Sequence, residues 1–342
     1  MPIPNDVPWT DLETKGFVHI RGFVEDAGLA QCRADFAAQP LQANNHNNPI
    51  SAASQRGIEG LKGAIEEVMG LVSSKTKIRV DCGLGAVYFA THRGVTFPWH
   101  QDHESYFATQ NHYDYLNFFI PIVKPVREKS NLMIVPFDTL EQSLPRTFRR
   151  VVRSGATMVY DVGGRHVLCQ SDSGTAHLTQ KGFDSIACTP QLAAGDLLLM
   201  RGDILHRTQD AETERVALSF RAGYGATKVS RARLADGGFA KAQSMVGNFK
   251  EYELLFRAFD ASGKNELPLS ELLRHLREQR QRPPVVVERP RRYLLRQKIR
   301  SGVLLSSLAK GLNELITQKV RFPYYRRQAG KVAAGRPNLG HA

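Results

Sequence analysis

The sequence has few cysteines and no long apolar run. Its 342 residues include four cysteines, and no two of them form a C-x-x-C pair: Cys32, Cys82, Cys169 and Cys188. This pattern predicts reduced, partly buried thiols and argues against a disulfide framework or a cysteine zinc site. There is no run of about 18 apolar residues and no signal-peptide pattern at the start. We therefore expect a cytoplasmic protein that does not span a membrane.

Negative charge is scarce in one part of the chain only. Residues 228–342 hold 24 Lys and Arg against 9 Asp and Glu, a net charge of +15, whereas residues 1–227 have a net charge of −2. The overall +13 is thus a property of the C-terminal third. Any acidic surface that the protein meets should be met there.

The residue pattern changes twice along the chain. Helical spacing over 25–38 and 55–73 gives way to short strands separated by turn residues, and the strands are expected at 85–90, 97–102, 115–123, 131–136, 156–162, 185–189, 195–201 and 215–224. A further strand is expected at 16–23. Many short strands without long helices between them favour an antiparallel jelly roll over an alternating α/β fold. The chain then becomes helical again, so we divide it into a jelly-roll domain, 1–227, and a basic helical extension, 228–342.

His100 and Asp102 are the clearest chemical signal. They are two residues apart in a short strand, so both side chains should point to the same face, with Cα atoms roughly 6.6 Å apart. A histidine from another strand would complete a 2-His-1-carboxylate set, which binds non-haem Fe(II) and leaves coordination positions open. His206 follows an apolar strand and is the expected third ligand.

Arg215 opens the next strand after His206. Arg215, Ala217 and Ser219 alternate and should share one face of that strand. A guanidinium and a hydroxyl facing into a barrel make a good carboxylate receptor, because the guanidinium can bind both oxygens of the carboxylate. Just past the metal strand, Glu104 and Tyr106 are the expected substrate-facing residues, together with His103.

These motifs resemble one family. The segments Trp99–Phe107 (WHQDHESYF), His206–Thr208 (HRT), Arg215–Ser219 (RVALS) and Ser130–Pro136 (SNLMIVP) are similar to the phytanoyl-CoA dioxygenase-like branch of the Fe(II)/2-oxoglutarate oxygenases. The resemblance covers roughly residues 10–225. It implies a double-stranded β-helix (a cupin-like jelly roll) with flanking helices, Fe(II) as cofactor, and 2-oxoglutarate and O₂ as cosubstrates.

The resemblance also implies roles for individual residues. His100, Asp102 and His206 would bind iron, and Arg215 would bind the distal carboxylate of 2-oxoglutarate with help from Thr208 or Ser219. Asn117, on the strand after the triad, is a further cosubstrate-binding candidate. Asp102 is present where halogenating relatives carry a small residue, so the expected reaction is hydroxylation.

The sequence departs from the family pattern at two points. The interval from His206 to Arg215 is short for this family, and the segment 135–138 (VPFD) lacks the Gly-Ser-His turn that often follows this strand in relatives. Two other histidines compete for the third ligand position. His177 has no arginine-led strand after it, and His166 follows a Gly-Gly turn, so both are weaker candidates than His206.

The C-terminal extension contains two distinct patterns. A helix pair at about 248–280 encloses a loop of calcium-binding length, but Lys264 and Asn265 occupy positions that an EF-hand fills with a ligand and a glycine, so we expect a packing unit that only resembles an EF-hand. Residues 292–320 form a basic amphipathic pattern. This segment could be a solvated helix face, an anionic-membrane contact or an acidic-partner contact. Nucleic acid is the least favoured partner, because no nucleic-acid-binding motif accompanies it.

The expected function is therefore a dioxygenase that acts on an unidentified small-molecule or lipid-linked substrate and releases succinate and CO₂. Within catalysis, the alternative is a jelly-roll enzyme with another metal or no cofactor. Outside catalysis, it is a peripheral membrane or acidic-partner binding protein whose barrel is vestigial.

Overall fold

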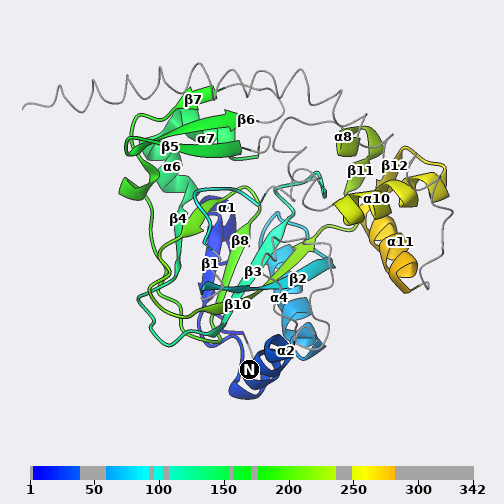
Figure 1. Ribbon diagram of the computed structural model, residues 1–342, viewed down its shortest axis with the longest axis horizontal. Helices are drawn as coiled ribbons and strands as arrows, with labels where there is room; N and C mark the ends of the chain where they lie inside the picture. The colour runs from blue at the N-terminus through cyan, green and yellow to red at the C-terminus, as the bar shows by residue number, and fades with distance from the viewer. Residues whose placement is uncertain are drawn as a thin grey trace, which may run out of the picture.

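Figure 1 shows a computed structural model of the protein. It describes residues 3–38, 59–91, 96–102, 108–153, 157–170, 176–235 and 249–281. The basic segment 292–320 lies outside these ranges, as do the three substrate-facing candidates His103, Glu104 and Tyr106. None of the described helices is long and apolar enough to cross a membrane.

A five-stranded antiparallel sheet forms the larger wall of the barrel. Its strand order is β1-β8-β3-β10-β2, and the strands are β1 (Phe17–Ile20), β8 (Leu197–Arg201), β3 (Leu116–Val123), β10 (Val216–Gly223) and β2 (Cys82–Ala90). The strands are rich in β-branched and aromatic residues, which favour a half-buried pleated surface.

The opposite wall is built around β4 (Leu132–Val135) and β9 (Leu205–Thr208), which pair antiparallel. Isolated antiparallel bridges extend this pair on both sides, His100 to His206 and Ile134 to Cys188. The second wall thus has the order 97–102, β9, β4, 188, and between β2 and β10 the chain passes repeatedly from one wall to the other. This connectivity is that of a double-stranded β-helix, so the predicted fold class is confirmed. Of the strands predicted at 97–102 and 185–189, only the single bridges at His100 and Cys188 form; the segment 97–102 is called the metal strand below.

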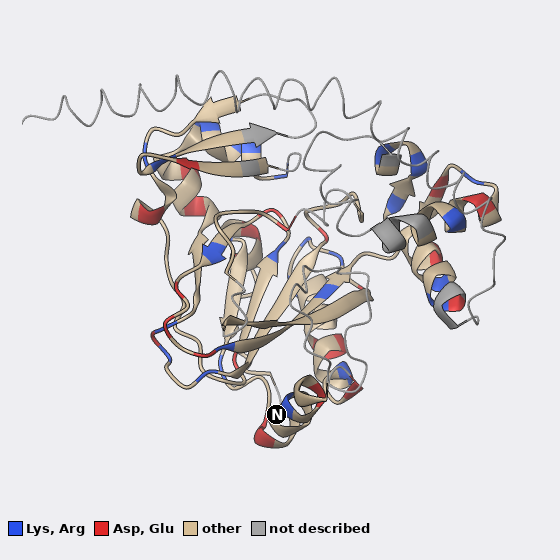
Figure 2. Ribbon diagram, viewed as in Figure 1, with Lys and Arg blue, Asp and Glu red and all other residues tan. Residues whose placement is uncertain are grey.

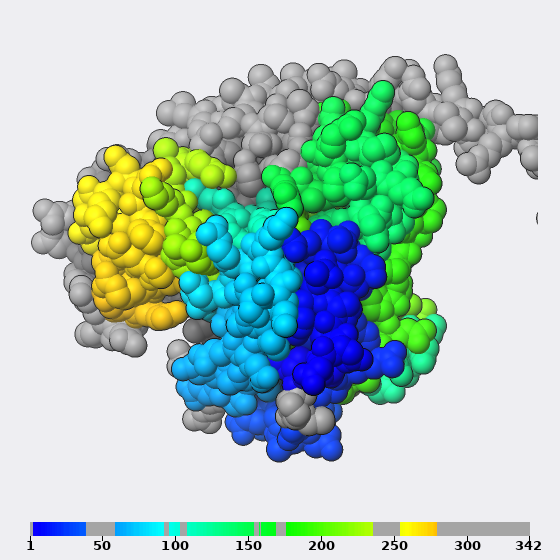
Figure 3. Space-filling view, turned by 180° about the vertical axis from the view of Figure 1, so that it is seen from behind, coloured from blue at the N-terminus to red at the C-terminus, as the bar shows by residue number. Residues whose placement is uncertain are grey.

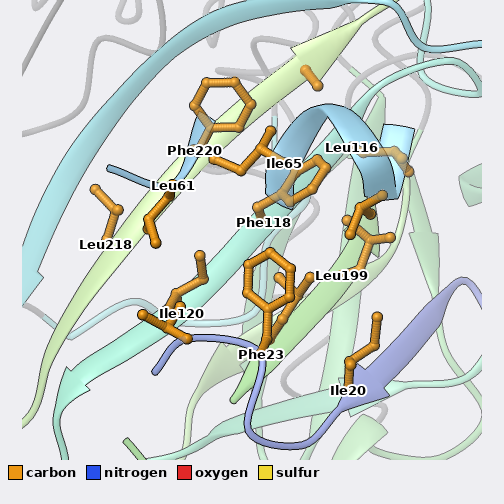
Figure 4. Packing of buried hydrophobic residues seen from close by; sticks show 14 of the residues in the cluster. Ile20, Phe23, Leu61, Ile65, Leu116, Phe118, Ile120, Leu199, Leu218 and Phe220 are labelled. Carbon is orange, nitrogen blue, oxygen red and sulfur yellow. The ribbon is translucent and has the colours of Figure 1, made fainter. Parts of the chain in front are cut away.

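Alternate residues of β10 face two different cores. Leu218 and Phe220 pack with Phe118 and Ile120 of β3 against Ile65, and this outer core is covered by helix α2 (Asp26–Ala37) and helix α4 (Lys62–Lys75) (Figure 4). Figure 3 shows this covered side of the molecule from behind, with the N-terminal segment and the α4–β2 region side by side. Ala217 instead belongs to the inner core between the two walls.

An insertion joins β4 to the strand position at Cys188. It contains two short helices and a three-stranded antiparallel sheet: α6 (Phe137–Ser143), α7 (Pro145–Val151), β5 (Thr157–Val162), β6 (Arg165–Gln170) and β7 (Ala176–Leu178), followed by the 3₁₀ turn η2 (Phe183–Ser185). The sequence pattern predicted β5 but missed α6, α7, β6 and β7. Buried residues of the insertion, among them Leu168 and Phe183, pack against Trp99, which directly precedes His100.

The helix pair of the extension packs on another part of the barrel. Helices α10 (Phe249–Ser262) and α11 (Leu269–Gln281) share a core with Tyr115 and Leu84, and Figure 1 shows them on the opposite side from the insertion. Strand β12 (Glu266–Pro268) pairs with β11 (Lys228–Ser230), which precedes the short helix α8 (Arg231–Ala235). A further short helix, α1 (Asp11–Thr14), precedes β1.

The loop between α10 and α11 pairs its acidic residues with the chain's own cations. Asp260 lies 2.5 Å from a guanidinium nitrogen of Arg231, and Glu271 lies 3.6 Å from the ammonium of Lys264. These carboxylates stand at the first and last positions of the calcium-loop pattern. Arg231 and Lys264 thus occupy, as cations, the role that a bound calcium ion has in an EF-hand loop.

Three cysteines, Cys32, Cys82 and Cys188, are free in the described part of the chain. Burial is the main cause that raises the pKa of Cys32 to about 11 and that of Cys82 to about 12. Both are therefore protonated thiols at neutral pH, as small buried side chains without nucleophilic character usually are.

Candidate metal centre

His100 and His206 are brought together by backbone pairing. The backbone N–H of each residue donates to the carbonyl of the other at 3.0 Å, so their side chains leave neighbouring strands at the same level. The two imidazole centroids lie 4.2 Å apart. Residues about a hundred positions apart in sequence thus become a facing pair.

Each of the two imidazoles is oriented by its own backbone. His100 Nδ1 lies 2.7 Å from the carbonyl of Pro98, and His206 Nδ1 lies 3.2 Å from the carbonyl of Ile204. Since a carbonyl can only accept, each Nδ1 carries the proton and each Nε2 keeps its lone pair. Metal-binding histidines are commonly held in this way.

Asp102 supplies the third ligand atom. One ligand atom from each of His100, Asp102 and His206 lies within 4.8 Å of the other two, and in the described part of the chain this is the one such group of three metal-binding side chains. Asn117 donates to Oδ2 of Asp102 at 2.9 Å. The other oxygen, Oδ1, is 4.0 Å from His206 Nε2 and is the one turned toward the imidazoles.

A polar network on β3 and β10 supports Asp102. The hydroxyl of Ser219 donates to Asn117 Oδ1 at 2.7 Å, and the guanidinium of Arg221 donates to the Ser219 hydroxyl and lies 3.8 Å from Asp102 Oδ1. The family resemblance implies cosubstrate roles for Asn117 and Ser219 but does not single out Arg221. The alternation 215, 217, 219, 221 on β10 was the signal that could have found it.

The surroundings set the protonation states that metal binding requires. Burial alone would raise the pKa of Asp102, but Arg221, the two histidines and the Asn117 hydrogen bond outweigh it, and the pKa lies below its usual value. Burial lowers the pKa of His206, although Asp102 opposes this. The carboxylate is therefore ionised and the imidazole neutral near pH 7, and both are the metal-binding forms.

Gln101 holds the metal strand from its other face. Its side-chain amide donates to the carbonyls of Val151 at 3.0 Å and Asp203 at 2.6 Å, and it accepts from the backbone N–H of Thr157 at 3.2 Å. Because Gln101 lies between His100 and Asp102, its three hydrogen bonds limit rotation of the strand. The insertion thereby helps to position two of the three ligands.

Arg215 directly precedes β10, at the end of the strand opposite to Arg221. It is 1% exposed, donates to the carbonyl of Ser130 at 3.0 Å and lies over the ring of Phe119. Its Nε has no hydrogen-bond partner among the described residues. Burial lowers the pKa of Arg215 to about 10, with Asp210 opposing, so the guanidinium remains charged at neutral pH.

The structure also describes the positions of the other predicted candidates, Thr208, His177 and His166. Thr208 is buried, two residues beyond His206, and its hydroxyl accepts from the backbone N–H of Phe97 at 3.0 Å. His177 contacts Thr147, and His166 stacks on Phe183 with ring centroids 4.4 Å apart. Both of these histidines belong to the insertion, and neither is part of the group of three ligand atoms.

The donor set fits Fe(II). Two neutral imidazole nitrogens and one carboxylate oxygen on one side of an ion are the facial arrangement of non-haem Fe(II) oxygenases, and no thiolate is present to favour a structural zinc site. His100, Asp102 and His206 are the residues that would hold the ion.

Comparison with known proteins gives structural likenesses only. No protein-family model matches the chain, and no curated protein matches it. The epimerase SnoN of nogalamycin biosynthesis, solved with Fe³⁺, α-ketoglutarate and nogalamycin RO, is 14% identical with a TM-score of 0.43 over 64% of this chain and 82% of its own.

Two further solved structures show a similarly low likeness. EctD from S. alaskensis, solved with 2-oxoglutarate and 5-hydroxyectoine, is 12% identical with a TM-score of 0.42 over 66% of this chain and 80% of its own. A prolyl-4-hydroxylase from Pseudomonas putida is 12% identical with a TM-score of 0.37 over 63% of this chain and 92% of its own. At this level of similarity, no residue role or activity transfers to this chain.

Proposed function

We propose that this protein is an Fe(II)/2-oxoglutarate-dependent oxygenase of the phytanoyl-CoA dioxygenase-like kind, which hydroxylates a small-molecule or lipid-linked substrate. The observation that supports this most directly is the convergence of His100, Asp102 and His206 inside the barrel, each held by a hydrogen bond that leaves one ligand atom available. When bound, Fe(II) supplies O₂ activation, and one O₂ is divided between the substrate hydroxyl and the succinate that forms as 2-oxoglutarate loses CO₂.

Arg215 is the proposed partner of the distal carboxylate of 2-oxoglutarate. It lies four residues before Ser219 on the same strand face, so their Cα atoms are roughly 13 Å apart, a span that the arginine side chain and a short diacid can bridge together. A buried guanidinium with an unused Nε–H next to an aromatic ring is well suited to a carboxylate. Thr208 lies on the opposite wall and is the proposed second donor.

Arg221 is the proposed partner of the near carboxylate of 2-oxoglutarate, the one next to the keto group. An Fe(II) ion with one carboxylate ligand carries a net charge of +1, and Arg221, 3.8 Å from Asp102, raises the positive charge of this centre. A 2-oxo acid bound at this centre would therefore be stabilised by two cationic groups, the ion and Arg221. Asn117, which Ser219 supports, holds Oδ2 of Asp102, so Oδ1 would be the oxygen that holds the ion.

Anaerobic binding tests the proposal. Addition of Fe(II) and 2-oxoglutarate to the protein should give a visible metal-to-ligand charge-transfer band. Asp102→Ala should abolish the band and weaken Fe(II) binding by at least about 100-fold, since even substitutions behind the ligands cost 10–100-fold. Succinate release in air, screened over classes of substrate, would then identify the substrate.

Asp138→Asn is the matched control, because Asp138 is an exposed carboxylate outside the barrel interior. It should leave the band unchanged. A protein that binds Fe(II) equally well with and without Asp102, or that gives no band with 2-oxoglutarate, would rule out the proposed chemistry. The non-catalytic alternative is not favoured, because the triad retains its full set of orienting hydrogen bonds.

A further inference from the structure

Helix α7 concentrates positive charge beside the insertion sheet. Arg146, Arg149 and Arg150 lie on this short helix, and together with His177 of β7 they line a hollow of ≈ 330 Å³. In Figure 2 the blue of Lys and Arg marks the ribbon of α7 next to the insertion sheet. The volume is near the lower end of the roughly 300–1,000 Å³ range of ligand pockets. The hollow lies outside the barrel interior and shares none of the residues of the metal centre.

The arginines of helix α7 repel one another, and two of them have no ion pair among the described residues. Arg146 is three residues from Arg149 and four from Arg150, so all three side chains share one side of the helix, where like charges are destabilising. Within the part of the chain that the structure describes, neither Arg146 nor Arg149 forms an ion pair. By contrast, the exposed Arg274 is paired with Glu278.

His177 is the one lining residue of the hollow that is not an arginine. Its Nε2 lies 3.3 Å from the hydroxyl of the buried Thr147, which does not line the hollow itself. Burial, followed by the proximity of Arg150 and Arg146, lowers the pKa of His177, so the imidazole is neutral at pH 7 and does not add to the repulsion. The hollow is therefore lined by three cations and one neutral imidazole.

Helix α7 packs against the metal strand. Leu144, which precedes the helix, and Val151, its last residue, pack in the core with Trp99, and the carbonyl of Val151 accepts the hydrogen bond from Gln101. Val151 is five residues from Arg146, a rise of roughly 7.5 Å in a helix. The arginines thus stand on an element that directly contacts the strand of His100 and Asp102.

We propose that this hollow binds a phosphate group. A phosphomonoester carries a charge of about −1.5 to −2 at pH 7 and three acceptor oxygens, which match several guanidinium forks better than a single carboxylate does. The phosphate belongs either to the substrate itself or to a separate phosphorylated effector. The substrate source rests on the proposed function, because it requires the reacting carbon to reach the metal centre while the phosphate stays at α7.

Titration with inorganic phosphate tests the site without relying on catalysis. In calorimetry at physiological chloride concentration, the wild-type chain should bind phosphate saturably, and Arg146→Gln/Arg149→Gln should bind it at least tenfold more weakly. The matched control is Arg21→Gln/Lys75→Gln, which removes two exposed charges elsewhere and should bind as the wild type does. Thermal melting would verify that all three proteins are folded.

Two results would overturn the proposal: the absence of saturable binding by the wild type, or equal affinity in the Arg146/Arg149 double variant. Either would identify the arginines as an ordinary solvated face. Failure of the charge-transfer band would instead refute the oxygenase and leave the phosphate titration unaffected.

A second experiment separates the two sources of phosphate. Succinate release is measured with pairs of phosphorylated and dephosphorylated small molecules. If the substrate carries the phosphate, only the phosphorylated member stimulates turnover, and its KM rises at least tenfold in the double variant. If an effector carries it, inorganic phosphate itself alters succinate release in the wild type but not in the double variant.

Discussion

Arg215 and Arg221 lie on the same face of the same strand and have very different surroundings. Arg221 is next to an ionised carboxylate and shares the network of Asn117 and Ser219. Arg215 has an aromatic ring, a backbone carbonyl and the electrostatic influence of Asp210, but no ion pair with a described carboxylate. The charge of Arg221 is thus partly balanced by Asp102, whereas Arg215 has no described counter-ion and is the better suited of the two to a ligand carboxylate that meets no metal. Chemical identity and strand position alone do not decide what a buried arginine does.

The largest expected effect is on 2-oxoglutarate binding, and it distinguishes Arg215 from Arg221 because only 2-oxoglutarate has a distal carboxylate. Arg215→Met should weaken 2-oxoglutarate binding by roughly 10–100-fold, the value of one or two charge-assisted hydrogen bonds, while Fe(II) binding is retained. The variant should also lose its preference for 2-oxoglutarate over 2-oxopentanoate, which lacks the distal carboxylate. Anaerobic titration of the charge-transfer band with both acids measures this preference.

Arg221→Met provides the contrasting result. This substitution should weaken the binding of 2-oxoglutarate and of 2-oxopentanoate by a similar factor, because both acids have the near carboxylate. The preference for 2-oxoglutarate should persist. If the preference instead disappears in Arg221→Met and survives in Arg215→Met, the two assignments are reversed.

The next effect concerns the network at the Arg221 end. Asn117→Ala removes the hydrogen bond to Asp102 Oδ2 and should lower Fe(II) affinity by about 10-fold, as is usual for residues that orient a ligand. Asn131→Ala is a suitable comparison, because Asn131 is equally buried but bonds to Arg127 and Leu192, away from the triad. Equal Fe(II) affinity in the two variants would show that Asn117 does not orient Asp102.

The smallest effect is a pH dependence at the Arg215 end. Burial, followed by the neighbouring charge of Arg215, lowers the pKa of Lys124 to about 8. Below that pH Lys124 is charged and favours an anion near Arg215, and above it the charge is lost, so 2-oxoglutarate affinity should fall severalfold between about pH 7 and pH 9. Lys124→Met should bind more weakly at pH 7 and show no such decline. A decline that persists unchanged in Lys124→Met would assign the titration to another group.

Much of the barrel followed from local patterns. The strands around 116–123, 197–201 and 216–223 were predicted because alternating or continuous apolar runs have few other stable solutions. The insertion was predicted poorly. Its strands β6 and β7 are short and polar, a pattern that is also typical of loops. The contacts of Trp99, Gln101 and Phe183 form only when the insertion packs against the metal strand, so the sequence pattern could not predict them.

The sequence by itself determined that His100 and Asp102 share a face, because the two-residue repeat of a strand is a local property. The same repeat determined that Arg215, Ser219 and Arg221 face one way on β10. Only the tertiary structure decided which distant histidine joins the pair, since that depends on the antiparallel register that sets His100 against His206. It also decided that Arg221 meets Asp102 and Arg215 does not, because the electrostatic environment of a buried charge is set by the strands packed around it rather than by its neighbours in sequence.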